Sequence, residues 1–231
     1  NEGIQHAREG NFDSAQKLFL KELKFKESAY PDNHPKIANS YVNLGVIYKK
    51  RGKLEKALEF YTKADKIYSE HPDFSSQTIG TNLQNMGNIY ALQRDYEKAE
   101  TYYSRAIELF KKDSVNNLER LGMVYNNLGI LYKERGLHHK ATNFYKNSIL
   151  LKKRVDPEAL YVTYGNLANS YRLLGNYKKS EEHFINAISQ GIQQFGKKSY
   201  LLNHHFLNYG LLKLDQKEYD RAKELIKKSL D

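Results

Sequence analysis

The sequence predicts an all-α fold made of repeated pairs of helices. Three observations support this prediction: small residues recur at a regular interval, apolar residues around them follow helical spacing, and glycine marks a turn between them. The first small residue of each unit lies at Gly45, Gly87, Gly129, Ala168 and Gly210. The second follows twelve residues later, at Ala57, Ala99, Ala141, Ser180 and Ala222.

The first helix of each pair carries apolar residues at i, i+3, i+4 and i+7, the spacing of one helix face. The clearest sets are Tyr41, Leu44, Gly45 and Tyr48, then Leu83, Met86, Gly87 and Tyr90, then Tyr125, Leu128, Gly129 and Tyr132. A small residue on the inner face lets two helix backbones approach closely, so large aromatic residues are expected to fill the space around it. Most of the 19 tyrosines are therefore predicted to lie in the core.

A turn is predicted between the two small residues of each unit. Its position is occupied by Gly52, Gly136 and Gly175, with Arg94 and Lys217 in the equivalent slots. Glycine just past a helical run is a common C-terminal signal, because it takes the left-handed backbone conformation without a side-chain clash. The second helix then continues with apolar residues after the small one, namely Leu58 and Tyr61, Tyr102 and Tyr103, and Phe144 and Tyr145.

These residues resemble the tetratricopeptide repeat. The family's pattern begins with a large apolar residue and the motif L-G-x-x-Y. An alanine, then a phenylalanine or tyrosine, and then a second alanine follow. The pattern is matched here by Tyr41, Leu44, Gly45, Tyr48, Ala57, Tyr61 and Ala64. A standard unit has about 34 residues, whereas 42 separate Gly45 from Gly87. This longer period is similar to that of kinesin light chains and of bacterial signalling and protease-associated proteins. The resemblance implies a right-handed superhelical solenoid of antiparallel helix pairs.

The chain is expected to form a single array over residues 1–231. Its predicted units are 1–37, 38–79, 80–121, 122–160, 161–202 and 203–231. Gly3, Gly10 and Ala15 are in register with the second unit, so the first repeat is expected to begin inside its first helix. The last repeat is expected to have an incomplete second helix. Both ends favour a fragment of a longer protein.

Asparagine recurs two residues ahead of the first small residue in every unit. The positions are Asn43, Asn85, Asn127, Asn166 and Asn208, and Asn1 falls in the same register. At about 100° per residue these side chains point away from the core within each pair, and the resemblance implies that this side of the first helix lines a concave groove. We call this set of asparagines the asparagine ladder.

The asparagine ladder is predicted to bind an extended peptide. An asparagine amide offers two donors and one acceptor, which match the N–H and C=O groups of a peptide backbone. The predicted binding residues are Asn43, Asn85, Asn88, Asn127, Asn166, Asn169, Asn208, Met123, Ile130, Leu173 and Lys50. A structural role for asparagine between adjacent first helices is the alternative, although asparagine is unfavourable in the middle of a helix.

Two other functions occur among proteins with such repeats. Chaperone-binding members of the family clamp a C-terminal carboxylate with basic residues, but the chain has Val42, Gln84, Asn126 and Gly165 at such positions, which argues against that function. The other is a regulatory or sensor array within a larger protein, with a protease-like or kinase domain outside this sequence. The predicted partner is a protein or peptide, or further domains of the same longer chain.

The net charge of +10 and the lysine pairs, such as Lys152-Lys153, are typical of a solvated outer surface. A basic group near the ends of the first helices, Lys49, Lys50, Arg51, Lys133 and Arg172, favours a peptide of acidic character. Nucleic acid is disfavoured, because no single face carries a basic stripe in the sequence pattern.

Catalytic, metal and cofactor sites are not expected, so the chain is predicted not to be an enzyme. The eight histidines include no i, i+4 pair for a metal, and the glycines lack the spacing of a phosphate-binding loop. With no cysteine, disulfides and thiol chemistry are excluded, which favours a cytoplasmic location. No apolar run approaches the ~20 residues of a membrane span, so no membrane association is predicted.

Overall fold

The computed structural model describes residues 2–71, 73–197 and 199–230. All regular secondary structure in these ranges is helical, which confirms the predicted all-α class. The chain divides into two compact units, Asn1–Asp113 and Ser114–Asp231. The division into six repeats of one array stays a prediction, and Asn1, which is in register with the ladder, lies outside the described residues.

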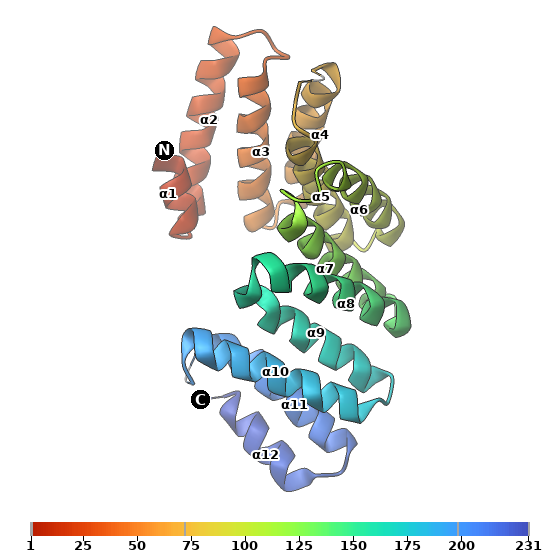
Figure 1. Cartoon of the computed structure of the whole chain (residues 1–231). Coiled ribbons are helices and arrows are strands. Elements are labelled where there is room, and N and C mark those ends of the chain that lie inside the picture. The colour runs from red at the N-terminus through yellow and green to blue at the C-terminus, as the bar shows by residue number, and fades with distance from the viewer. Residues whose placement is uncertain (1, 72, 198, 231) are drawn as a thin grey trace. The chain divides into compact units, whose positions relative to one another are not determined.

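Unit 1 is made of helices that pack in sequential pairs (Figure 1). They are α1 (Glu2–Arg8), α2 (Phe12–Ala29), α3 (Pro35–Lys50), α4 (Leu54–Glu70), α5 (Ser76–Leu92) and α6 (Tyr96–Lys111). Helix α1 packs on α2, α3 on α4, and α5 on α6, while α2 also contacts α3 and α4 contacts α5. Each helix therefore lies between its chain neighbours, as expected for stacked helical repeats.

Unit 2 follows the same plan. It contains α7 (Leu118–Glu134), α8 (His138–Val155), the short 3₁₀ helix η1 (Pro157–Ala159), α9 (Leu160–Leu173), α10 (Tyr177–Phe195), the 3₁₀ helix η2 (Tyr200–Leu202), α11 (Asn203–Asp215) and α12 (Tyr219–Lys228). The first helices also meet here, because α7 contacts α9 and α9 contacts α11. Their outward faces are therefore adjacent within this unit.

The small residues pack against large rings of the second helix, as predicted. A Cβ atom on Gly87 would lie 2.8 Å from the Tyr103 ring, which leaves no room for a side chain. A Cβ atom on Gly45 or Gly129 would lie still closer to the ring of Tyr61 or Tyr145. These three rings are fully buried, so the close helix approach and the aromatic core depend on each other.

Other tyrosines depart from the predicted core role. Tyr41, Tyr90, Tyr102 and Tyr125 are only half-buried, and each contacts an aromatic ring on the other helix of its pair. Tyr90 stacks on Tyr102, whereas Tyr41 and Tyr125 are tilted against Phe60 and Phe144. The Tyr90 and Tyr102 rings, for example, lie 5.2 Å apart and nearly parallel. Stacked rings bury their faces while their edges reach solvent.

The predicted turns all adopt the left-handed backbone conformation. The φ angle is +72° at Gly52, +73° at Gly136 and +70° at Gly175. Arg94 and Lys217 take the same conformation, with φ of +62° and +63°. The turn is therefore determined by the packing of the helices on either side, since it persists where the residue is not glycine.

Candidate functional site

The ladder residues of unit 1 lie on the outer side of its first helices. Asn43 is in α3 and Asn85 in α5, and both side chains are half-buried. These two amides make no hydrogen bond within the described part of the chain.

In unit 2 the ladder residues are placed less uniformly. Asn127 in α7 and Asn166 in α9 are half-buried, and the Asn166 Nδ2 donates a long hydrogen bond of 3.4 Å to Asn126 Oδ1 on α7. Asn208 in α11 is buried, and its Nδ2 donates to the backbone oxygen of His204 at 2.8 Å. The amide nitrogen of Asn208 is thus engaged within its own helix.

The two additional asparagines of the predicted site accept hydrogen bonds from neighbouring side chains. The Tyr103 hydroxyl donates to Asn88 Oδ1 at 2.8 Å, and the Arg172 Nε donates to Asn169 Oδ1 at 3.2 Å. Each of these bonds holds the side-chain oxygen and orients the amide NH₂ group. The orientation follows from geometry, because a terminal amide has its two donors opposite the acceptor.

Apolar side chains accompany the asparagines on the first helices of unit 2. Met123 is 42% exposed, Ile130 37% and Leu173 47%. These residues lie on adjacent helices, since α7 contacts α9. An exposed apolar group beside polar amides is typical of an interaction surface. In unit 1, Lys50 is likewise exposed at the end of α3.

The basic group predicted at the ends of the first helices is largely neutralised. Arg51 Nη2 lies 2.7 Å from Asp13, Lys133 Nζ lies 3.1 Å from Glu134, and Arg172 Nη1 lies 2.8 Å from Asp215. Burial, assisted by the charge of Lys50, lowers the pKa of Lys49. The attraction of this group for an acidic peptide is therefore weaker than the sequence suggests.

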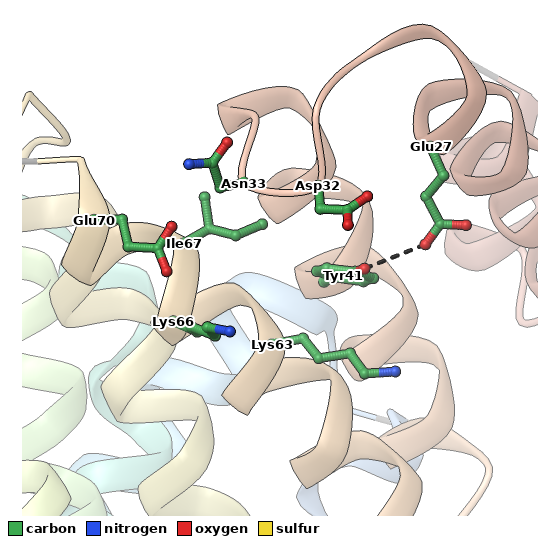
Figure 2. Close-up of a pocket in the computed structure, with 8 residues that line it drawn as sticks. All are labelled: Glu27, Asp32, Asn33, Tyr41, Lys63, Lys66, Ile67 and Glu70. Carbon is green, nitrogen blue, oxygen red and sulfur yellow. Dashed lines mark hydrogen bonds between the residues drawn. The ribbon is translucent and has the colours of Figure 1, made fainter.

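A pocket that the sequence did not predict opens in unit 1 (Figure 2). It has a volume of about 520 Å³ and is lined by Glu27, Asp32, Asn33, Tyr41, Lys63, Lys66, Ile67 and Glu70. The Tyr41 hydroxyl donates to Glu27 at 3.2 Å, and burial, followed by the charge of Glu27, raises the pKa of Tyr41 to about 12. The pocket mixes three carboxylates with two lysines, so it favours no single ligand charge.

One residue that lines this pocket departs from the repeat pattern. Asp32 occupies the register of Phe74, 42 residues later, and Phe74 closes the next junction of unit 1 by packing edge-on against Tyr68 at 4.6 Å. Asp32 cannot fill that space with apolar surface. The sequence signal for this pocket is an acidic residue at a junction position that is aromatic in the next repeat.

The adjacent histidines of α11 have different environments, as their helical positions predict. His204 is exposed, whereas His205 is buried with its ring edge-on to Tyr161 at 5.6 Å. The ring of His205 also fills the space that a side chain at position 165 would need, which explains Gly165. Burial, with a smaller contribution from His204, lowers the pKa of His205 to about 4.

This histidine is expected to make unit 2 sensitive to acid. The unfolded chain takes up a proton at the ordinary pKa of about 6.5, whereas folded His205 resists protonation down to about pH 4. Its contribution to stability is therefore complete above pH 6.5 and falls as the pH drops toward 4. We expect a loss of about 2 kcal/mol in the free energy of unfolding between pH 7 and pH 5.

Urea unfolding followed by circular dichroism at a series of pH values measures this loss. His205→Leu should flatten the dependence, while His139→Gln, which changes an exposed histidine of the same unit, should leave it unchanged. Equal slopes for the wild type and His205→Leu would show that other groups cause the acid sensitivity.

Within the described ranges, no group of three or more histidine, aspartate or glutamate side chains is arranged to hold a metal ion. No helix in those ranges is long and apolar enough to cross a membrane.

Comparison with known proteins gives matches over nearly the whole chain. The model of the family described as tetratricopeptide repeat matches residues 1–70, 78–151 and 160–231. No curated protein matches the chain. Among solved structures, BtubC (BKLC) from P. vanneervenii is 28% identical, with a TM-score of 0.73, over 84% of this chain and 78% of that one.

More distant structures share the fold. A putative kinesin light chain from Podosopora anserina with TPR-like repeats is 13% identical, with a TM-score of 0.68, over 83% of this chain and 92% of that one. The apo form of RapI is also 13% identical, with a TM-score of 0.75, over 99% of this chain and 94% of that one. At such identities the likeness concerns the arrangement of helices alone.

Proposed function

Because this chain belongs to the tetratricopeptide repeat family, whose members typically bind proteins or peptides without catalysis, we propose that it is a peptide-binding module. The proposed ligand is an extended segment of a partner protein. Its backbone would be bound by the asparagine ladder, on the outward face of the first helices. Selectivity would come from the apolar residues beside the ladder.

This proposal rests mainly on the exposure of the Asn43 and Asn85 side-chain amides and on their lack of hydrogen bonds within the described chain. They occupy the same register of successive repeats, are half-exposed, and have no hydrogen-bond partner in the described chain. Asparagine lowers helix stability relative to alanine, so a repeated asparagine without an internal partner is better explained by a ligand than by folding. Asn166, with only a 3.4 Å bond to Asn126, supports the same role.

The contribution of each ladder position is expected to differ. Asn43, Asn85, Asn127 and Asn166 are accessible, whereas Asn208 is buried and bonded to His204. We therefore propose that Asn43 and Asn85 bind peptide backbone in unit 1, that Asn127 and Asn166 do so in unit 2, and that Asn208 mainly orients His204. Met123, Ile130 and Leu173, which are exposed in unit 2, would contact apolar side chains of the ligand.

Replacing Asn85, Asn127 and Asn166 together by alanine should abolish binding of a 12-residue peptide selected from a display library on the wild-type protein. The loss follows from removing accessible ladder amides from both units, because each hydrogen bond to a peptide backbone is worth about 1 kcal/mol. Isothermal titration calorimetry measures the affinity. Helicity and melting temperature should stay close to those of the wild type, because alanine is the better helix former.

A matched control replaces Thr62, Thr101 and Gln193 by alanine, since these side chains are exposed on the second helices α4, α6 and α10. The control should bind the selected peptide as the wild type does. Unfolding of the asparagine triple variant would show that the ladder is structural. Unchanged peptide affinity would show that the ligand binds elsewhere.

A further inference from the structure

Helix α8 differs in charge from every other second helix of the described pairs. Between His138 and Val155 it carries five basic residues and no acidic one, Lys140, Lys146, Lys152, Lys153 and Arg154 being the basic set. Each of α2, α4, α6, α10 and α12 contains at least two acidic residues. The basic composition of α8 is thus a local property and does not follow from the repeat.

The solvent face of α8 concentrates these charges. Lys140, Lys146 and Lys153 are exposed, and none of them forms an ion pair in the described residues. Some lysines of other second helices are paired with carboxylates, as in Lys63 with Glu59 at 2.8 Å. The exposed face of α8 therefore carries positive charge without internal compensation.

Two of the uncompensated charges converge from different helices. Lys146 of α8 and Lys179 of α10 both lie over the ring of Tyr171 in α9, with Nζ atoms 5.8 Å and 5.5 Å from the ring centroid. Lys179 also lacks an ion pair in the part of the chain that the structure describes. Both ammonium groups therefore lie near the same ring, and an anion that contacts both would be attracted by each of them.

The field of these lysines reaches the neighbouring histidine. His183 of α10 is stacked between Tyr164 and Tyr171, with ring centroids 5.8 Å and 5.6 Å away. Its pKa is lowered by burial first and then by Lys146, Lys179 and Lys153, while Glu182 acts in the opposite direction. The positive charges of three lysines from two helices thus all lower the pKa of the same side chain, His183.

We propose that Lys146, Lys153 and Lys179, here called the α8–α10 cluster, form a second docking surface that binds an acidic segment of a partner protein. A carboxylate of the segment is held between Lys146 and Lys179. An apolar side chain of the segment packs on Leu150, which is 66% exposed on the same face of α8. This surface lies on second helices, so it is separate from the asparagine ladder on the first helices.

An acidic protein segment fits this surface better than a nucleic acid. Single-stranded nucleic acids bind through aromatic platforms on which the bases stack, and the exposed face of α8 offers none, since the Tyr171 ring beneath the lysines is buried. The exposed Leu150 would be unused by a phosphate backbone. Opposite charge and an adjacent apolar contact are both features of protein recognition.

A binding experiment distinguishes these ligands. The probe is a fluorescein-labelled 12-residue peptide of alternating glutamate and serine with one central leucine, compared with the same peptide carrying glutamine in place of glutamate and with a labelled dT12 oligonucleotide. We expect the glutamate peptide to bind most tightly, with an affinity that falls steeply as NaCl increases.

The variant Lys146→Gln with Lys179→Gln should lower the affinity for the glutamate peptide about tenfold. A control with the same loss of charge, Lys17→Gln with Lys24→Gln on the exposed face of α2, should change it less than about twofold. Bound peptide should also raise the pKa of His183, measured by NMR, in the wild type but not in the cluster variant.

Three results would overturn the proposal: no binding of the glutamate peptide, equal losses in the cluster and control variants, or tighter binding of dT12. The asparagine triple variant should retain the glutamate peptide. That result would show that the two surfaces bind independently, since the proposal for one can be wrong while the proposal for the other holds.

Discussion

Phe184→Ala is expected to lower the free energy of unfolding by about 3–5 kcal/mol, the usual cost of removing a fully buried ring. Phe184 is 0% exposed and packs against Ala168, Ile188 and Leu212, with its ring 5.8 Å from that of Tyr209. It joins α9, α10 and α11, so its loss leaves a cavity where three helices meet. A domain has only about 5–15 kcal/mol of stability in total.

Urea unfolding measured by circular dichroism tests this expectation, and hydrogen exchange locates the effect. Amide protection should be lost first in unit 2. Phe25→Ala provides the control, because Phe25 is 69% exposed on α2 and its removal should cost less than about 0.5 kcal/mol. Similar losses for the two variants would mean that Phe184 is not a principal core residue.

Glu181→Ala is expected to destabilise unit 2 by about 2–3 kcal/mol. Lys213 is only 1% exposed, and its Nζ lies 2.7 Å from Glu181 and 3.1 Å from Glu218. Removing Glu181 leaves a buried ammonium with a single carboxylate and deprives the Tyr209 hydroxyl of its acceptor at 2.7 Å. The cost stays below the 3–5 kcal/mol of a fully buried pair, because Glu218 remains and Glu181 is partly exposed.

Chemical denaturation of three variants tests the role of this pair. Glu182→Ala, the exposed neighbour, should have little effect. Glu181→Leu with Lys213→Met should recover most of the stability lost in Glu181→Ala, since a well-packed apolar pair can replace a buried ion pair. If Glu181→Ala and Glu182→Ala behave alike, Lys213 does not depend on Glu181.

The ion pair of Glu181 and Lys213 is also expected to make the stability of unit 2 fall at low pH. Burial alone would raise the pKa of Glu181, but the hydrogen bonds from Lys213 and Tyr209 outweigh it, so that the pKa lies below its ordinary value. The contribution of Glu181 is therefore present above the unfolded pKa, about 4.5, and is lost as the pH falls through the lower folded value.

The fold could be predicted from the sequence because each repeat contains the same small residues, the same helical spacing of apolar residues and the same turn position. The small residues at Gly45, Gly87 and Gly129 predicted the close packing against Tyr61, Tyr103 and Tyr145 that the structure contains. The turn slots were also predicted, although Arg94 and Lys217 carry no glycine signal of their own. Their conformation could be assigned only by register.

The candidate site was predicted less completely, because helical periodicity gives the direction of a side chain but not its partners. Asn43 and Asn208 share one register, yet the first is accessible and the second is buried and bonded to His204. The neutralisation of Arg51 by Asp13 joins residues 38 positions apart, and periodicity does not reveal such pairs. The pocket beside Tyr41 includes Asp32, which departs from the repeat pattern. Residues that follow the pattern therefore do not predict this pocket.

The left-handed turn slots also make the chain a convenient host for site-specific labels. Arg94 in unit 1 and Lys217 in unit 2 already place a long, exposed side chain there at positive φ. The chain contains no cysteine, so a cysteine introduced at either position would be the single thiol for a fluorophore. One label then reports on one unit, so ligand-induced ordering of the two halves can be followed separately without disturbing either helix of a pair.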